Sequence, residues 1–264
     1  ATRTIGIVVP DLRNTFFAEV VEAIEAAASN AGVSVLIMTT GENPTRTEER
    51  VRALVERRVD GVVIIPPLQM KADPTVTLGL TLPTVVVDRV EPTYVSSTVA
   101  TDSENAAYLG AKYLLSIDHR TILFAVNSLV ASNSRERVSG FERAMAEAGV
   151  TNSRVVVAGI SVEEVRKSLR EALSERTYSA LFTASNPVTI GAMKAITDLS
   201  LHIPDDLSLL AFDDFEWLSL VPPFISAIRQ PSEGIGREVW RLLEGQIEVF
   251  EALLGFGVLD GLAQ

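Results

Sequence analysis

The chain lacks several residue types on which common protein chemistries depend. It has no cysteine and only two histidines among its 264 residues. Without cysteine there is no disulfide framework, no thiolate nucleophile and no Cys-ligated metal. The two histidines, His119 and His202, fall in different expected helix–strand connections. A histidine metal site and a Ser–His–acid triad are therefore not expected.

Motifs that bind nucleotides or catalyse acyl transfer are also missing. The sequence contains no G-x-x-x-x-G-K-[ST] phosphate loop and no G-x-S-x-G nucleophile turn. The spacing of Gly255, Gly257 and Gly261 does not match a dinucleotide fingerprint. We therefore expect no cofactor and no enzyme activity, and an α/β enzyme is kept only as the least favoured alternative.

Long apolar runs are absent as well. The longest, such as Gly61–Pro67, have the length of a strand, whereas a membrane helix needs ~18 apolar residues or more. Residues 1–9 enter an expected strand directly and show no signal-peptide pattern. Together with the lack of cysteine, this predicts a cytoplasmic protein with no membrane partner.

Basic charge is scarce, because 34 acidic residues oppose 23 basic ones and leave a net charge of −11. Proteins that bind nucleic acid use clusters of Lys and Arg against the phosphates. This chain is therefore not expected to hold DNA by itself, and any DNA binding must come from a segment outside it.

What the sequence does contain is a regular alternation of apolar strands and amphipathic helices. Expected strands are Thr4–Val9, Val33–Thr39, Val62–Ile65, Leu82–Val87, Ser97–Ala100, Thr121–Val126, Arg154–Ala158, Ala180–Thr183, Leu207–Phe212 and Ile225–Ile228. Expected helices are Phe16–Ala31, Thr45–Val59, Glu104–Leu115, Arg135–Ala148, Val162–Glu175, Val188–Leu199 and Ser232–Leu243. Helices between strands predict parallel sheets covered on both faces. Two successive sets predict an α/β protein of two doubly wound, Rossmann-like domains.

Polar and aromatic side chains follow the expected strands, at the edge where open parallel sheets bind ligands. The sets are Asp11, Asn14, Phe16 and Phe17; Asp88 and Arg89; Asn127, Arg135 and Arg137; Ser185 and Asn186; Asp213, Asp214 and Trp217; Arg229 and Gln230. Carboxylate and amide oxygens accept hydroxyl protons, arginine donates, and flat rings pack against apolar ligand faces. This combination suits a neutral polyhydroxylated ligand.

Each of these residues also has a structural interpretation. An Asp or Asn after a strand is often a helix cap or a turn former, as Asp102 could be. Phe16 and Phe17 are roughly 100° apart on a helix, so at least one is expected in the core. The structural alternative for Trp217 is that it merely covers the edge of its domain. The alternative for Arg137 is a surface ion pair with a neighbouring Glu. The ligand hypothesis depends on the recurrence of polar and aromatic residues after six different strands.

Several segments resemble the effector-binding core of the lactose/galactose repressor (LacI/GalR) family, from about residue 4 to residue 245. They include TIGIVVPDLRNTFF, LPTVVVDR and PPFISAIRQP, and the most specific are RERVSGF and IPDDLSLLAFDD. The resemblance implies a periplasmic binding protein type I fold, with two domains joined by a multi-strand hinge. It places the domains at residues 1–101 with about 231–254, and 102–230 with about 255–264. The tail from Val249 to Gln264 does not resemble the family's closing strand.

The resemblance also implies a function. A small-molecule effector (a sugar, polyol or nucleoside) would bind in the interdomain cleft of a homodimer, and closure would reach operator DNA only through an N-terminal helix-turn-helix headpiece that this chain lacks. Ligand contacts are implied at Asn14, Phe16, Phe17, Asp88, Arg89, Arg137, Asn186, Asp213, Trp217 and Gln230. The family shares its fold with periplasmic sugar-binding proteins, so the alternative is a periplasmic sugar-binding protein of an ABC transporter.

Overall fold

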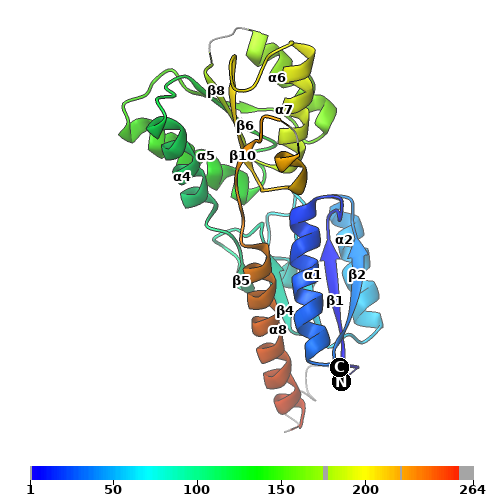
Figure 1. Cartoon of the computed structure of the whole chain (residues 1–264). Coiled ribbons are helices and arrows are strands. Elements are labelled where there is room, and N and C mark those ends of the chain that lie inside the picture. The colour runs from blue at the N-terminus through cyan, green and yellow to red at the C-terminus, as the bar shows by residue number, and fades with distance from the viewer. Residues whose placement is uncertain (1, 175–177, 221, 256–264) are drawn as a thin grey trace. The chain divides into compact units, whose positions relative to one another are not determined.

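The computed structural model describes residues 2–174, 178–220 and 222–255 (Figure 1). The chain forms two compact units. The first runs to Thr101 and resumes at Pro231, and the second is Asp102–Gln230. Within the described ranges, none of the helices has the length and apolar character needed to span a bilayer.

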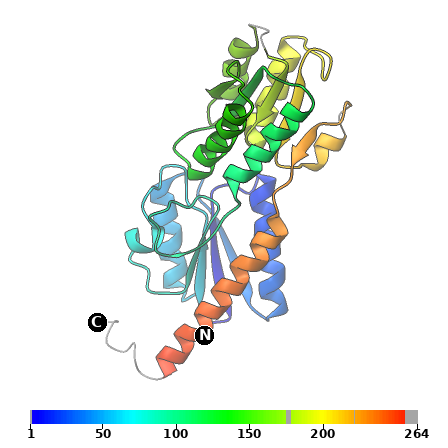
Figure 2. The same ribbon diagram turned by 90° about the vertical axis from the view of Figure 1, so that its left-hand side faces the viewer.

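The first unit is built on a five-stranded, wholly parallel sheet. In sheet order its strands are β2 (Ser34–Thr39), β1 (Thr4–Val9), β3 (Gly61–Ile64), β4 (Thr84–Val87) and β5 (Ser97–Val99). Its helices are α1 (Thr15–Asn30), α2 (Pro44–Glu56), the short α3 (Pro74–Thr77) and α8 (Ser232–Gly255). In both views α1 and α8 run side by side along the sheet (Figures 1 and 2).

The apolar strands of this unit have both faces buried, because successive side chains of a strand point to opposite faces. On β1, Ile7 and Val9 belong to the cluster beneath α1 and α8, whereas Val8 packs in the cluster that contains Leu54 of α2. A run of consecutive apolar residues is therefore what a central strand of this sheet requires.

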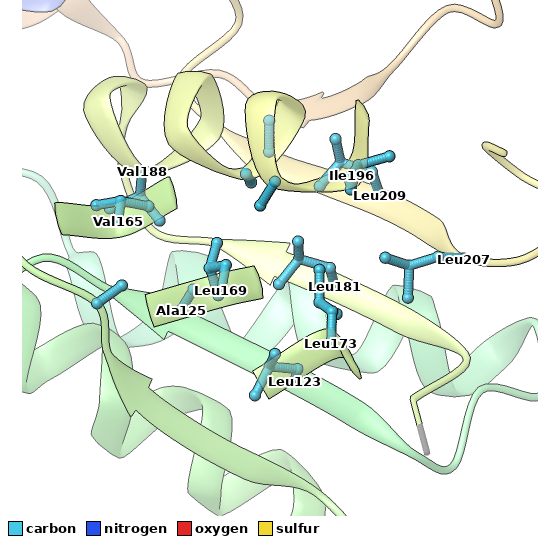
Figure 3. Close-up of a cluster of buried hydrophobic side chains, with 14 of the residues drawn as sticks. Leu123, Ala125, Val165, Leu169, Leu173, Leu181, Val188, Ile196, Leu207 and Leu209 are labelled. Carbon is cyan, nitrogen blue, oxygen red and sulfur yellow. The ribbon is translucent and has the colours of Figure 1, made fainter. Parts of the chain in front are cut away.

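The second unit repeats this plan. In sheet order its strands are β10 (Ser226–Ile228), β9 (Ser208–Phe212), β8 (Ala180–Thr183), β6 (Ile122–Val126) and β7 (Arg154–Val157). Its helices are α4 (Ser103–Ser116), α5 (Ser132–Glu147), α6 (Val162–Ser174), α7 (Asn186–Asp198) and the 3₁₀ helix η1 (Glu216–Ser219). Figure 3 shows the cluster in which Leu169 of α6 and Val188 of α7 meet Leu181 of β8. Numbered from the first strand of each unit, both sheets have the order 2-1-3-4-5.

The α/β class, the parallel sheets and the two successive sets of elements are confirmed. The predicted end of the last helix at Leu243 is wrong, because α8 continues to Gly255. The predicted return of the chain to the second subdomain concerns residues 255–264. Apart from Gly255, which ends α8, these lie outside the described residues.

Candidate functional site

In each unit the fourth strand of the sheet ends in a buried aspartate. Asp88 follows β4 and Asp213 follows β9, with backbone φ angles of 69° and 78°. Asp tolerates this left-handed conformation better than most residues. The N–H of Asp88 donates to Val99 O and that of Asp213 to Ile228 O, both at 2.9 Å, so each bonds to the fifth strand. The two units therefore place equivalent carboxylates at their carboxyl-terminal sheet edges.

The α1 end of the first unit is mainly structural in the described chain. Asn14 caps α1 by accepting a hydrogen bond from the Phe16 N–H at 3.3 Å. Phe16 and Phe17 are both buried in the core, with ring centroids 5.6 Å apart. Phe17 also reaches the sheet edge, because the Arg89 guanidinium carbon lies 5.4 Å from its ring centroid. Whether either ring touches a ligand stays a prediction.

Arg89 is engaged within its own unit. Its Nη1 and Nη2 donate to the two carboxylate oxygens of Glu42, each at 2.8 Å. Nη1 also donates to Pro66 O at 2.9 Å. Glu42 could not be singled out from the sequence, because it stands in the segment Gly41–Asn43, which is typical of a turn.

A second carboxylate joins two loops at this edge. Asp73 accepts hydrogen bonds from the Thr75 N–H and hydroxyl, and from the N–H groups of Val95 and Ser96. These bonds connect the loop after β3 to the loop between β4 and β5. Burial alone raises the pKa of Asp73, but the hydrogen bonds outweigh it and lower that pKa from 3.8 to about 2.

This depressed pKa predicts acid sensitivity of the first unit. Since the folded pKa lies below the unfolded one, the stabilisation by Asp73 is complete above about pH 4 and is lost as the pH falls toward 2. Asp73→Asn should remove it by replacing an acceptor with a donor opposite two N–H groups, at a cost of about 1–3 kcal/mol. Urea unfolding of both proteins at pH 7 and pH 3 measures this, and the difference between them should shrink at pH 3. An equal difference at both pH values would contradict the assignment.

Arg137 lies at the corresponding edge of the second unit and is only 4% exposed. Its Nη1 donates to Ala184 O, and its guanidinium carbon stands 3.7 Å from the centroid of the Phe212 ring. The alternative interpretation of Arg137 as a surface residue is therefore wrong. Phe212 immediately precedes Asp213, so Arg137 is held close to the end of β9 by a cation–π contact.

Amide side chains gather near this point. Gln230 Nε2 donates to Asp213 Oδ1 at 2.5 Å, and both residues are buried. Asn186, the first residue of α7, is buried, and among the described residues its Oδ1 and the Ser185 Oγ have no hydrogen-bond partner. Buried polar atoms without a partner are rare, and hydroxyl groups of a ligand could satisfy them.

Three further residues named in the sequence have structural contacts in the described chain. Trp217 lies in η1, is partly buried and packs against the core cluster of its own unit, as its alternative interpretation held. Asp102 caps α4 by accepting from the Asn105 N–H. His119 lies in the turn before β6 with its Nδ1 2.9 Å from Ser179 Oγ, and burial lowers its pKa. No group of three or more His, Cys, Asp or Glu side chains suited to a metal occurs among residues 2–174, 178–220 and 222–255.

Comparison with known proteins identifies the relatives of this chain. The profile of a family described as a periplasmic binding protein-like domain matches residues 111–252. The HTH-type transcriptional repressor PurR of Vibrio cholerae is 27% identical over 251 residues, which cover 94% of this chain and 75% of the repressor. The ribose operon repressor of Haemophilus influenzae is 29% identical, with 89% and 72% covered.

Solved structures agree with the sequence relatives. A protein from Burkholderia thailandensis assigned as a ribose operon repressor has 31% identity and a TM-score of 0.84, with 94% of both chains covered. A probable LacI family transcriptional regulator from Corynebacterium glutamicum has 25% identity and a TM-score of 0.86, with 92% and 93% covered. The chain belongs to the LacI family of transcriptional regulators, and it carries that family's effector-binding domain with the periplasmic-binding-protein-like fold.

Proposed function

We propose that this chain senses a small neutral polyhydroxylated effector, a sugar or polyol, on behalf of a transcription regulator. The observation that carries the proposal is the pair of equivalent buried aspartates, Asp88 and Asp213, at the sheet edges. Arg89 Nε lies 3.8 Å from Asp88 Oδ2, and the Arg137 guanidinium lies over the ring of Phe212, which directly precedes Asp213. Carboxylates accept and guanidinium groups donate hydrogen bonds to hydroxyls. Because the guanidinium groups do not outnumber the carboxylates, Glu42 included, a neutral ligand is favoured over an anionic one.

The names of two relatives support a pentose as the first compound to try. Both the Haemophilus influenzae relative and the Burkholderia thailandensis structure are assigned as ribose operon repressors. A phosphorylated effector would require additional cations or a nest of backbone N–H groups, whereas the proposed contacts pair two carboxylates with two guanidinium groups.

The proposed mechanism is a coupling between effector binding and the arrangement of the two units. The effector would bind to the sheet edges of both units, favour their closure and thereby reposition the helix-turn-helix headpieces of the full-length regulator. The ten residues predicted from the sequence remain the proposed contacts. Four of them, Arg89, Phe16, Phe17 and Trp217, are packed or bonded within their own units in the described chain. Relatives that are transcription repressors favour this role over a transporter's solute receptor or an enzyme.

A thermal-shift screen tests the proposal. D-ribose, other pentoses, hexoses, ribitol and nucleosides are compared with ribose 5-phosphate and other anions. Saturation at about 100 times the dissociation constant contributes roughly 2.7 kcal/mol, which for a chain of this size raises the melting temperature by about 5 °C. If only phosphorylated or strongly anionic compounds stabilise the protein, the polyol assignment is wrong.

We also predict that the chain is a homodimer that does not bind duplex DNA by itself. Exposed apolar side chains on the edge strand β2 (Leu36, Ile37) and after η1 (Leu220, Phe224) offer surfaces for a second copy, and the net charge of −11 opposes binding to phosphates. Sedimentation at micromolar concentration should show a dimer, and Phe224→Asp should weaken it. A monomer in sedimentation, or tight and salt-sensitive DNA binding in a gel shift, would each contradict one half of this prediction.

A further inference from the structure

The sheet edge of the first unit contains an ion pair that the proposed contacts do not explain. Arg89 binds both carboxylate oxygens of Glu42 in a two-pronged contact, with both distances 2.8 Å. The side chains of Arg89 and Glu42 are 11% and 28% exposed. The pair is thus far more shielded than the fully solvated surface pairs, which contribute little.

Glu42 lies in the loop after β2, which contacts the loops that follow three other strands of the sheet. It stands after β2, where it and Gly41 have left-handed φ angles of 60° and 65°, and the Gly41 N–H donates to Pro10 O after β1 at 2.8 Å. Its Oε2 accepts from the Leu68 N–H after β3 at 3.0 Å. Its other partner, Arg89, follows β4. Removing this one carboxylate therefore releases the contacts that join the loops after β2, β3 and β4, whereas the backbone bond to Pro10 remains.

The contacts with Glu42 and Pro66 also fix the guanidinium group of Arg89, which lies next to Asp88. With Nη1 and Nη2 bonded to Glu42 and Nη1 also bonded to Pro66 O, the guanidinium cannot turn without breaking three hydrogen bonds. Its Nε lies 3.8 Å from Asp88 Oδ2. An acceptor is thereby held beside a donor at a set spacing, an arrangement that can pair with two neighbouring hydroxyls.

We propose that Glu42 is a positioning residue of the effector site, which holds Arg89 in place and so sets the preference of the Asp88–Arg89 pair among sugars that differ at one hydroxyl. Glu42 acts through Arg89 and does not itself contact the effector. The inference rests on the proposed function, because it concerns the same sheet edge.

The test compares Glu42→Gln with Glu48→Gln, a matched control that breaks the exposed Glu48–Arg52 pair on α2 of the same unit. Calorimetric titrations use D-ribose, D-arabinose, D-xylose, D-glucose and D-galactose. Glu42→Gln should lower the affinity for the preferred sugar about tenfold, as loss of a charged hydrogen-bond partner does. It should also reduce the ratio between the affinity for this sugar and the affinities for its epimers. The control should match the wild type. Unchanged affinities, or an equal loss for every sugar with a lower melting temperature, would overturn the positioning role.

A second measurement needs no effector. Hydrogen exchange of the Leu68 amide in the free protein should be faster in Glu42→Gln than in Glu48→Gln, because its acceptor is altered only in the first variant. If the wild type binds none of the five sugars, the proposed function is in doubt, whereas the exchange result still decides whether Glu42 holds the loops. Equal exchange in both variants would overturn the inference. Should Glu42→Gln fail to fold, Glu42→Asp, which keeps the charge but shortens the reach, replaces it.

Discussion

Replacing Gly140 by alanine is expected to destabilise the second unit by about 3 kcal/mol or more, at the upper end of what overpacking costs. A Cβ atom at Gly140 on α5 would lie 1.9 Å from the Glu104 carbonyl oxygen and 2.9 Å from the Tyr108 backbone nitrogen, both on α4. Backbone atoms cannot rotate away as a side chain can. The two helices would have to separate and lose their contacts.

Gly245→Ala provides the matched control. Gly245 lies within α8, and a Cβ atom there would have no neighbour within 4 Å. Because alanine favours helix by about 0.5–1 kcal/mol over glycine, this change should be neutral or stabilising. The two tryptophans report the units separately, since Trp217 lies in η1 of the second unit and Trp240 in α8 of the first. Denaturation followed by fluorescence in Trp→Phe backgrounds measures both effects, and a Gly140→Ala protein as stable as the wild type would refute the close approach of α4 and α5.

Arg137→Ala is expected to weaken effector binding about 10- to 100-fold, which corresponds to the 1.5–3 kcal/mol of a charge-assisted hydrogen bond. The buried guanidinium lies over the Phe212 ring next to Asp213, where it would donate to an effector hydroxyl. Arg137→Lys should recover only part of the affinity, because an ammonium group lacks the planar fork that stacks on the ring.

The control for Arg137 is Arg143→Ala on the same helix. Arg143 also lies over an aromatic ring, that of Tyr108, but its side chain is 42% exposed and paired with Glu104. Titration of the best sugar from the thermal-shift screen measures the affinities. If Arg137→Ala kept wild-type affinity while losing stability, its role would be structural. A comparable loss of affinity in Arg143→Ala would show that the effect is not specific to the sheet edge.

The fold could be predicted from the sequence because its signals are local and repeated. Buried parallel strands need continuous apolar runs, and helices between them need one apolar face. The end of α8 could not be predicted in this way. Gly245 is a residue type that ends helices, yet the helix continues because Leu243 and Ile247 pack near Gly61 of β3 and Gln246 accepts a hydrogen bond from the Thr84 N–H. These partners are distant in the sequence.

The candidate site could be predicted only where a residue directly follows a strand, because the end of the strand fixes the position of that residue. Asp88 and Asp213 could be placed because each directly follows an apolar strand. The burial of Arg137 could not be predicted, because the sequence pattern of a polar helix is the same whether its arginine faces solvent or packs on a ring. Glu42 was missed for a similar reason, because its partner Arg89 is 47 residues away. In the sequence, Phe16 and Phe17 fit both a core and a ligand role, and Trp217 fits both a cover for the domain edge and a ligand contact. In the structure Phe16 and Phe17 lie in the core, and Trp217 is partly buried against the core cluster of its own unit.

Closure of the two units on an effector is measured by small-angle X-ray scattering with and without a saturating sugar. We expect that a neutral sugar which raises the melting temperature by about 5 °C also reduces the radius of gyration, because binding to the sheet edges of both units would favour closure. Ribose 5-phosphate at the same concentration serves as the control and should produce neither effect. A stabilising sugar that leaves the radius of gyration unchanged would contradict sensing by closure of the two units.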